Sequence, residues 1–286
     1  MRSRKTIRTA LLIPLAAVIV IAAGFCITIL AIQDGFIFRN VNDPESREFL
    51  RGKPGYSEIG FTAKNGTAYH GMLFRQAEGK APLVIYFGGN GECSYSNLRG
   101  RANSDNWKYF EGYNYLFADY EGYGINGGRA DYKKNYGQAL AVYDYAVTLP
   151  FVDSSNIMVM GFSLGTGSAV YLAASRPVSG LVLAAPYAEG RDLYNNFLPL
   201  FYGPVRLLVK QKLNSAGYAP NVKCPVLIFA SRTDEMVPFY SSRNLAKKFP
   251  GNADFVELDN TGHNGIFRAP GVLDRIHSFL LDSIQE

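Results

Sequence analysis

The stretch Ile157-Met158-Val159-Met160-Gly161-Phe162-Ser163-Leu164-Gly165 decides the fold of this chain. Its apolar residues up to Gly161 predict a buried strand, and the small apolar residues from Leu164 to Ser175 predict a helix that begins directly after Ser163. The pentapeptide 161–165 has the pattern G-x-S-x-G. A sharp turn from strand to helix exposes a serine hydroxyl, and the flanking glycines relieve crowding around its strained backbone. We therefore interpret Ser163 as a candidate nucleophile; the alternative is an unused junction between a strand and a helix.

Strand and helix signals alternate on both sides of this stretch. Short apolar runs typical of strands buried on both faces occur at Pro82–Phe87, Tyr113–Ala118, Ile157–Gly161, Leu181–Ala185, Pro225–Ala230 and Phe255–Leu258. An antiparallel hairpin, Ser57–Ala63 with Ala68–Phe74, is expected before them, and helices are expected at Lys133–Leu149, Leu164–Ser175, Ser241–Phe249 and Val272–Ile284. This order predicts an α/β domain over residues 56–286, with a mostly parallel sheet and helices on both faces.

Residues 191–220 interrupt the alternation. They are rich in large apolar side chains and too long for a simple connection between two strands. Two interpretations remain open, a small helical cap inserted into the domain or one ordinary helix with an irregular start.

The N-terminal segment has the composition of a membrane anchor. Residues 11–32 carry no charge, and as a helix they would span about 33 Å, the thickness of a bilayer core. A cleaved signal peptide and a buried core helix are alternatives, but the run is long for the first and lacks a polar face for the second. Basic residues within 1–10 predict a cytoplasmic N-terminus, so that the domain beyond a linker at 33–55 faces the periplasm, lumen or cell exterior.

Charge excludes nucleic acid as a partner. The 286-residue chain has a net charge of +5, but four basic residues precede the first acidic residue, Asp34. Without those four, the net charge is +1, which leaves no basic surface for phosphate backbones.

Of the three cysteines, Cys26 falls in the apolar segment, whereas Cys93 and Cys224 either form a disulfide or stay as buried thiols.

A nucleophilic serine needs a base, and His263 is the best candidate. The chain has two other histidines: His70 lies in the early hairpin, and His277 lies inside the C-terminal helix. His263 instead follows the last predicted strand, and loops at the carboxyl ends of parallel strands meet where ligands bind.

The base in turn needs an acid that orients its ring. Asp234 follows the strand Pro225–Ala230, and the resulting order Ser, Asp, His is the one expected for an α/β hydrolase. Glu235 and Asp259 are rival acids, which would otherwise be solvated loop carboxylates.

Two backbone N–H groups are candidates for an oxyanion hole. One belongs to Leu164, the residue after the serine, and the other to Asn90 in the loop after Pro82–Phe87. In that loop Gly88 and Gly89 would let the backbone approach the substrate carbonyl, so both are predicted to contact substrate.

The ordered motifs resemble the BEM46-like branch of the α/β-hydrolase superfamily, which is itself similar to serine aminopeptidase and prolyl-oligopeptidase domains. They are Gly88-Gly89-Asn90-Gly91, Asp119-Tyr120-Glu121-Gly122-Tyr123-Gly124, Gly161–Gly165, Asp234 to Pro238 and Gly262-His263-Asn264. The resemblance covers roughly residues 56–286 and implies the fold, the triad and, for many members, an N-terminal anchor. Members often have His at the position of Gly88 and Arg at that of Glu121.

Together these features predict a membrane-anchored serine hydrolase that cleaves an acyl ester or thioester of a small-molecule or lipid-like substrate. A peptidase and a non-catalytic membrane-tethered scaffold are the alternatives. No cofactor or metal is expected, because the histidines and cysteines are dispersed. The isolated match Gly122-x-Gly124-x-x-Gly127 to a dinucleotide-binding pattern lacks the acidic residue that should end the next strand.

Overall fold

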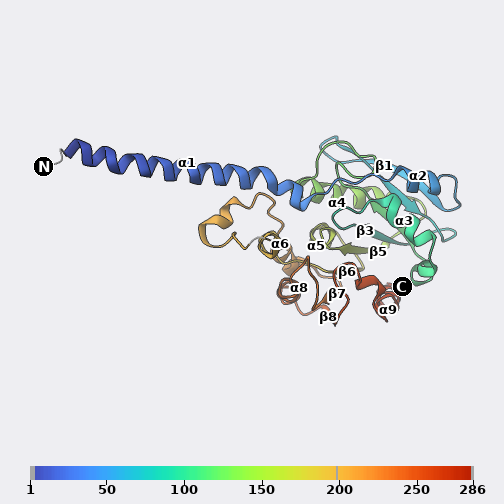
Figure 1. Ribbon diagram of the computed structural model, residues 1–286. Coiled ribbons are helices and arrows are strands. Elements are labelled where there is room, and N and C mark those ends of the chain that lie inside the picture. The colour runs from blue at the N-terminus through green and yellow to red at the C-terminus, as the bar shows by residue number, and fades with distance from the viewer. Residues whose placement is uncertain (1–3, 198, 285–286) are drawn as a thin grey trace.

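A computed structural model describes residues 4–197 and 199–284, and its centre is one eight-stranded sheet (Figure 1). The strands lie in the order β1-β2-β4-β3-β5-β6-β7-β8. Their bounds are β1 Tyr56–Thr62, β2 Ala68–Phe74, β3 Ala81–Phe87, β4 Asn114–Ala118, β5 Val152–Phe162, β6 Gly180–Ala184, β7 Val226–Ser231 and β8 Ala253–Leu258.

The sheet is parallel from β4 to β8, and β1 and β2 add an antiparallel edge. Strands β4, β6 and β7 are buried along their whole length, which explains why their sequences are continuous apolar runs. This arrangement is the α/β-hydrolase fold, as the sequence predicted.

Helices cover both faces of the sheet. They are α2 Pro44–Leu50, α3 Ser94–Ala102, α4 Tyr132–Ala146, α5 Gly165–Ser175, α8 Phe239–Ala246 and α9 Val272–Asp282, with short 3-10 turns η1 Asp105–Phe110 and η4 Ile266–Arg268. The strand order reverses after β3, so right-handed crossovers place α3 on one face and α4, α5 and α8 on the other. Helix α9 returns to the face of α3, where the Tyr113 hydroxyl donates to the Leu280 carbonyl at 2.7 Å.

The reversal of strand order creates the position of the functional site. Strand β3 lies between β4 and β5, and Phe87 pairs with Gly161 at the last register position of β3 and β5. The loop that begins at Gly88 and the turn at Ser163 therefore leave the sheet side by side. Crevices at such reversals are where open α/β sheets bind ligands.

The N-terminal helix is longer than the apolar segment. Helix α1 runs from Arg4 to Ile37 and projects away from the body (Figure 1). Its stretch Pro14–Gly35 is long and apolar enough to cross a membrane, and only 6% of its 18 most apolar consecutive residues are buried. Residues 33–55, expected to be a linker, differ from that expectation. They contain the end of α1 and the whole of α2, because Ile37, Phe38 and Leu50 are buried against the domain.

The segment 191–220 holds several short helices rather than one. They are α6 Gly190–Phe197, η2 Gly203–Leu208, α7 Ser215–Tyr218 and η3 Ala219–Asn221. The part around η2 forms a projection that lies beside the last turns of α1 (Figure 1). We call residues 199–209 the cap loop.

Cys93 and Cys224 are separate buried thiols, so the two cysteines do not form the disulfide that the sequence left open.

A first prediction concerns the contact of α5 with β3. A Cβ atom at Gly165 would collide with the Phe87 carbonyl oxygen and lie 2.7 Å from the Gly88 carbonyl oxygen, and neither backbone oxygen can move freely. We expect Gly165→Ala to lower the free energy of unfolding by about 2 kcal/mol or more. Urea unfolding of the detergent-solubilised protein measures this change.

Gly137 in α4 provides the matched control, since a Cβ there meets no atom within 4 Å. Gly137→Ala should raise stability by roughly 0.5–1 kcal/mol through helix propensity. Equal effects of the two substitutions would contradict the packing described here.

Candidate active site

Ser163 sits in a strained turn between β5 and α5. Its φ angle is 49°, a left-handed conformation that is unfavourable for a residue with a side chain. Backbone contacts hold it there: the Ser163 N–H donates to the Ala184 carbonyl at 2.9 Å, and its carbonyl accepts from Thr166 N–H at 3.0 Å. Gly161 leaves room for the turn, because a Cβ there would lie 2.9 Å from the Cβ of Ala169.

His263 lies against Ser163, as its place in the sequence suggested. Its Nε2 is 2.9 Å from the Ser163 Oγ, and its side chain is 7% exposed. The ring of Phe162 stands 5.0 Å from the imidazole, which shields one side of it from water. The backbone N–H of His263 donates to the Glu235 carboxylate at 3.0 Å, so the loop carrying the histidine is fixed at both its backbone and its ring.

Asp234 holds the other nitrogen of the ring. Its two carboxylate oxygens lie 2.9 and 3.0 Å from His263 Nδ1, and its side chain is 2% exposed. One of these oxygens also accepts the N–H groups of Met236 and Val237. An Nδ1–H that donates to this carboxylate leaves Nε2 free to accept the proton of the Ser163 hydroxyl. The arrangement has the geometry of a Ser-His-Asp triad.

The two rival acids and the two other histidines make contacts outside the Ser163–His263–Asp234 arrangement. Glu235 binds the backbone of His263 rather than its ring, and the side chain of Asp259 is 74% exposed and lies 3.5 Å from Arg232. His70 contacts the Asn126 side chain, and the His277 ring contacts the Tyr109 carbonyl.

The predicted oxyanion donors belong to Leu164, directly after Ser163, and to Asn90, directly after Gly89. Within the described residues, neither the Asn90 N–H nor the Leu164 N–H has an acceptor in the chain. The loop of Asn90 approaches the turn closely, since a Cβ at Gly89 would lie 3.5 Å from the Cβ of Ser163 and 2.9 Å from the Phe162 ring. Two free N–H donors beside a serine hydroxyl can stabilise negative charge on a carbonyl oxygen.

Gly88 and Gly89 use their backbones differently from the prediction that both contact substrate. A Cβ at Gly88 would collide with the Phe117 ring, and the Gly88 carbonyl accepts the Tyr120 hydroxyl at 3.0 Å, so this residue faces the interior. The Gly89 N–H donates to the Glu92 carboxylate at 2.8 Å and is not free for a ligand. The side of Gly89 that faces Ser163 is still open to a close approach.

Glu92 is a residue that the sequence analysis missed. Its carboxylate accepts the Gly89 N–H, the Tyr86 hydroxyl at 3.1 Å and the Asn97 amide at 2.6 Å, and thereby fixes the turn that carries Asn90. A signal was present: a glutamate three residues after a turn position can reach back to that backbone N–H, as in a helix capping box.

The other contacts of this loop lead to the N-terminal segment. The Asn90 side-chain oxygen accepts the Arg39 backbone N–H at 2.6 Å and the Tyr123 hydroxyl at 3.0 Å.

Glu121, where related sequences often have Arg, is buried in an ion pair with Lys134 at 2.5 Å. It therefore joins α4 to the loop after β4 and adds no charge beside Ser163.

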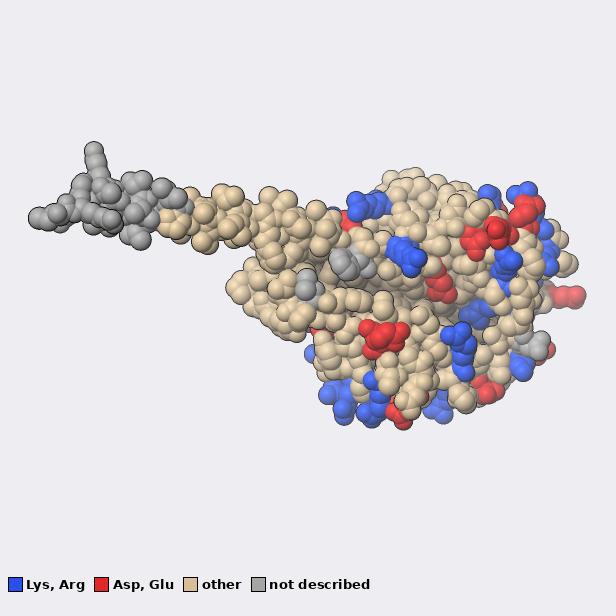
Figure 2. All heavy atoms as spheres, viewed as in Figure 1, with Lys and Arg blue, Asp and Glu red and all other residues tan. Residues whose placement is uncertain are grey.

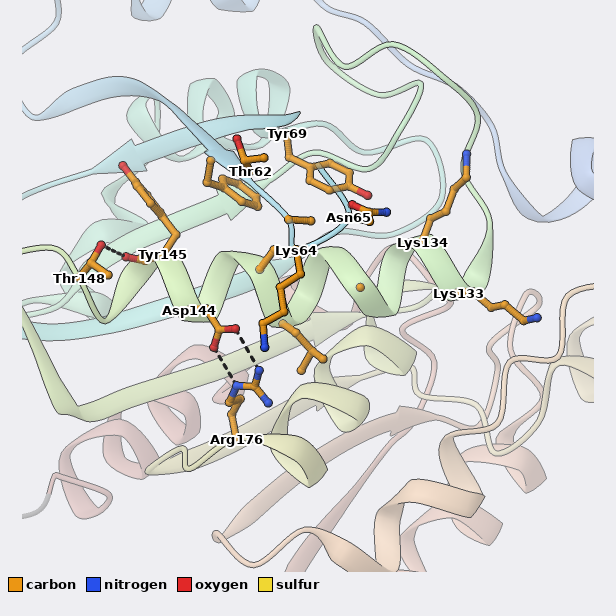
Figure 3. A pocket seen from close by; sticks show the side chains of 15 residues that line it. Thr62, Lys64, Asn65, Tyr69, Lys133, Lys134, Asp144, Tyr145, Thr148 and Arg176 are labelled. Carbon is orange, nitrogen blue, oxygen red and sulfur yellow. Dashed lines mark hydrogen bonds and ion pairs between the residues drawn. The ribbon is translucent and has the colours of Figure 1, made fainter. Parts of the chain in front are cut away.

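A large hollow of about 620 Å³ lies elsewhere, between the β1–β2 hairpin and α4 (Figure 3). Its lining includes Lys64, Lys133, Lys134 and Arg176 but none of the triad residues. Arg176 is paired with Asp144 at 2.8 Å. Within residues 4–197 and 199–284, no group of three His, Cys, Asp or Glu side chains is arranged to hold a metal ion.

Comparisons with known proteins agree with this architecture. Residues 128–263 match the dienelactone hydrolase family. An uncharacterised protein of Mycobacterium tuberculosis is 29% identical over 80% of this chain and 81% of its own length, and alpha/beta hydrolase domain-containing protein 17C of Xenopus tropicalis is 25% identical over 76% and 67%. The solved structure of the Pyrococcus furiosus esterase Pf2001 superposes with a TM-score of 0.70 at 18% identity, over 87% of this chain and 97% of that one.

The chain has the α/β-hydrolase fold and is similar to members of the α/β-hydrolase superfamily. These likenesses show the fold and a similarity to hydrolases, and they do not name a substrate for this chain.

Asp119, at the start of the loop after β4, is fully buried beside the site. Its carboxylate accepts the N–H of Ser94 at 2.7 Å and the Ser94 hydroxyl at 2.6 Å. Burial without a cation raises the pKa of Asp119 to about 7, although both contacts with Ser94 oppose the shift.

This pKa predicts a pH dependence of stability. The native state binds a proton at Asp119 that the unfolded chain releases near pH 4, so the contribution of Asp119 is most favourable below pH 4 and is lost as pH rises towards 7. Asp119→Asn should not show this loss. The difference in unfolding free energy between the variant and wild type should therefore shift in favour of the variant by at least ~1 kcal/mol from pH 5 to pH 8. Urea unfolding at both pH values measures it, and parallel pH profiles of the two proteins would refute the assignment.

Proposed function

We propose that this protein is a membrane-anchored serine hydrolase that cleaves an acyl ester or thioester through an acyl-enzyme. The observation that carries the proposal is the continuous chain of contacts from Asp234 through His263 to Ser163, with 2.9 Å between His263 Nε2 and the Ser163 Oγ. Hydrogen bonding between a serine, a base and an orienting acid is the arrangement that nucleophilic catalysis needs.

In the first half of the proposed reaction, the Ser163 Oγ attacks the acyl carbonyl while His263 Nε2 takes its proton. Asp234 stabilises the imidazolium, and the Asn90 and Leu164 N–H groups bind the oxyanion. His263 then returns the proton to the departing alcohol or thiol, and the acyl group stays on Ser163. In the second half, water attacks the acyl-enzyme by the same route and releases the acid.

The membrane anchor is part of the proposal. It is supported by the apolar stretch Pro14–Gly35 and by basic residues that precede it, which favour a cytoplasmic N-terminus and an outward-facing domain. The burial of Ile37 and Phe38 supports an uncleaved helix, because these side chains belong to the packed domain.

Covalent labelling tests the proposed nucleophile. We expect the detergent-solubilised full-length protein to react with a fluorophosphonate probe, and we expect Ser163→Ala to abolish labelling because the attacking atom is gone. His263→Ala and Asp234→Asn should slow it at least ~10²-fold through loss of the base or its orientation. Gel fluorescence against time measures the rates.

His277→Ala, which removes a histidine bound to the Tyr109 carbonyl, is the control and should label like wild type. Undiminished labelling of the Ser163→Ala protein would rule out the proposed nucleophile.

Glu92 should act as a positioning residue for the oxyanion loop. Glu92→Ala removes the acceptor for the Gly89 N–H and frees the turn that carries Asn90, so we expect kcat for p-nitrophenyl butyrate to fall about 10-fold to 100-fold with little change in KM. Glu92→Gln, which keeps one acceptor oxygen, should recover part of the loss. Steady-state kinetics on these variants and on the exposed control Glu111→Ala provide the measurement, and a changed KM at constant kcat would argue against this role.

A further inference from the structure

Apart from Arg206, the cap loop carries no charge, and it presents an apolar surface beside α1. The sequence from Leu193 to Val205 contains no Asp, Glu, Lys or Arg. Tyr202 is 62% exposed and Leu207 is 77% exposed, whereas large apolar side chains of the body are mostly buried. On the face shown in Figure 2, the projection and the tan part of α1 beside it are mostly free of Lys, Arg, Asp and Glu, and most charged side chains lie over the rest of the body.

Contacts fix the depth of the cap loop relative to α1. The Gln33 side chain donates to the Leu208 carbonyl and accepts the Lys210 N–H, both at 2.7 Å. The Lys210 ammonium then pairs with Asp34 at 2.5 Å. These polar contacts mark the end of the apolar stretch Pro14–Gly35 and attach the base of the loop to it.

The loop reaches from that boundary towards the apolar part of α1. Ile29 is 5% exposed although it belongs to the membrane stretch, and it lines a small cavity of about 40 Å³ together with residues of α1, α6 and the cap loop. The lining residues are Ile29, Ile32, Gln33, Ile37, Tyr194, Phe197 and Phe201. Ile29 lies five residues before Asp34, about 8 Å deeper along the helix. Side chains that pack around Ile29 therefore lie within the outer leaflet whenever α1 spans the bilayer.

The two helices that line this cavity are also linked to the loops that carry Asn90 and Asp234. On the α1 side, the chain after Ile37 reaches Arg39, whose N–H donates to the side chain of Asn90 in the oxyanion loop. On the α6 side, the amide of Asn196 donates to the Glu235 carbonyl at 2.7 Å, beside Asp234. Each side of the cavity is thus connected by a hydrogen bond to a loop at the candidate site.

We infer that the cap loop lies in the outer leaflet and that the acyl chain of a bilayer lipid reaches Ser163 between α1 and α6. This inference rests on the proposed function and names its substrate class, a long-chain acyl ester resident in the membrane. A cavity of about 40 Å³ holds little more than one water-sized group, so the cap loop must move away from α1 to admit a chain. Arg206, the exposed neighbour of Leu207, has a side chain long enough to reach lipid phosphates from an inserted loop.

Fluorescence quenching tests the depth of the cap loop. In a Cys26→Ser background, Leu207→Cys and Leu281→Cys are each labelled with bimane in the full-length protein, since Cys93 and Cys224 are buried. Leu281 in α9 is the matched control, an exposed leucine of the body. In phosphatidylcholine vesicles with nitroxide on the acyl chains, we expect quenching at 207 and none at 281. An equal extent of quenching at the two positions would overturn the inference.

Hydrolysis tests the route of the substrate. The readout is the ratio of hydrolysis of p-nitrophenyl palmitate in phosphatidylcholine vesicles to that of p-nitrophenyl acetate in water. Leu207→Asp should lower this ratio about tenfold or more, because a carboxylate opposes insertion of the loop, and Leu281→Asp should leave it unchanged. An unchanged ratio in Leu207→Asp overturns the inference.

Fluorophosphonate labelling of the same preparations separates the two proposals. A protein that labels at Ser163 but whose ratio is insensitive to Leu207→Asp contradicts the membrane route alone. A folded wild-type protein without labelling contradicts the proposed function itself, whatever the depth of the cap loop.

Discussion

The left-handed backbone of Ser163 is the constraint on which the rest of the structure depends. A φ of 49° on a residue with a side chain persists only where its neighbours hold it, and here the Ala184 carbonyl, Gly161 and Gly165 do so. The same turn begins α5, which packs so closely on β3 that Gly165 touches the backbone after Phe87. This strained turn thereby joins Ser163, the proposed nucleophile, to the central strands and to the loop that begins at Gly88.

The N-terminal segment also contacts the candidate site. The Asn90 side chain accepts the Arg39 N–H, so the chain leaving α1 helps to orient the loop that carries Asn90. Gln33 and Asp34 are buried under the base of the cap loop. As the proposed membrane anchor, α1 would set both the orientation of the site relative to the membrane and its distance from it.

Much of this architecture could be predicted from the sequence, because the signals are local. Continuous apolar runs are the consequence of burial on both faces of a sheet, and the glycines around Ser163 are required by one turn. His263 followed from its place after the last strand. The choice between Asp234 and Glu235 was harder, since neighbouring side chains point in different directions, and the geometry assigns the ring to one and the backbone to the other.

The features that escaped prediction depend on contacts between distant segments. Nothing near residues 33–55 indicates that Ile37 and Phe38 are buried against the domain or that Arg39 meets Asn90. Gly88 faces the interior, where the Phe117 ring of a neighbouring strand leaves no room for a side chain. Likewise, the arrangement of the cap loop beside α1 is fixed by Gln33 and Lys210, which are 177 residues apart.

Detection of the acyl-enzyme tests the central claim most directly. Full-length protein is mixed with excess p-nitrophenyl butyrate, quenched in acid within the first turnover and measured by intact mass and peptide mapping. The account predicts a burst of p-nitrophenolate equal to the enzyme concentration and a butyryl group confined to the peptide that contains Ser163. A butyryl group on a different residue, or equal turnover by Ser163→Ala, would contradict it.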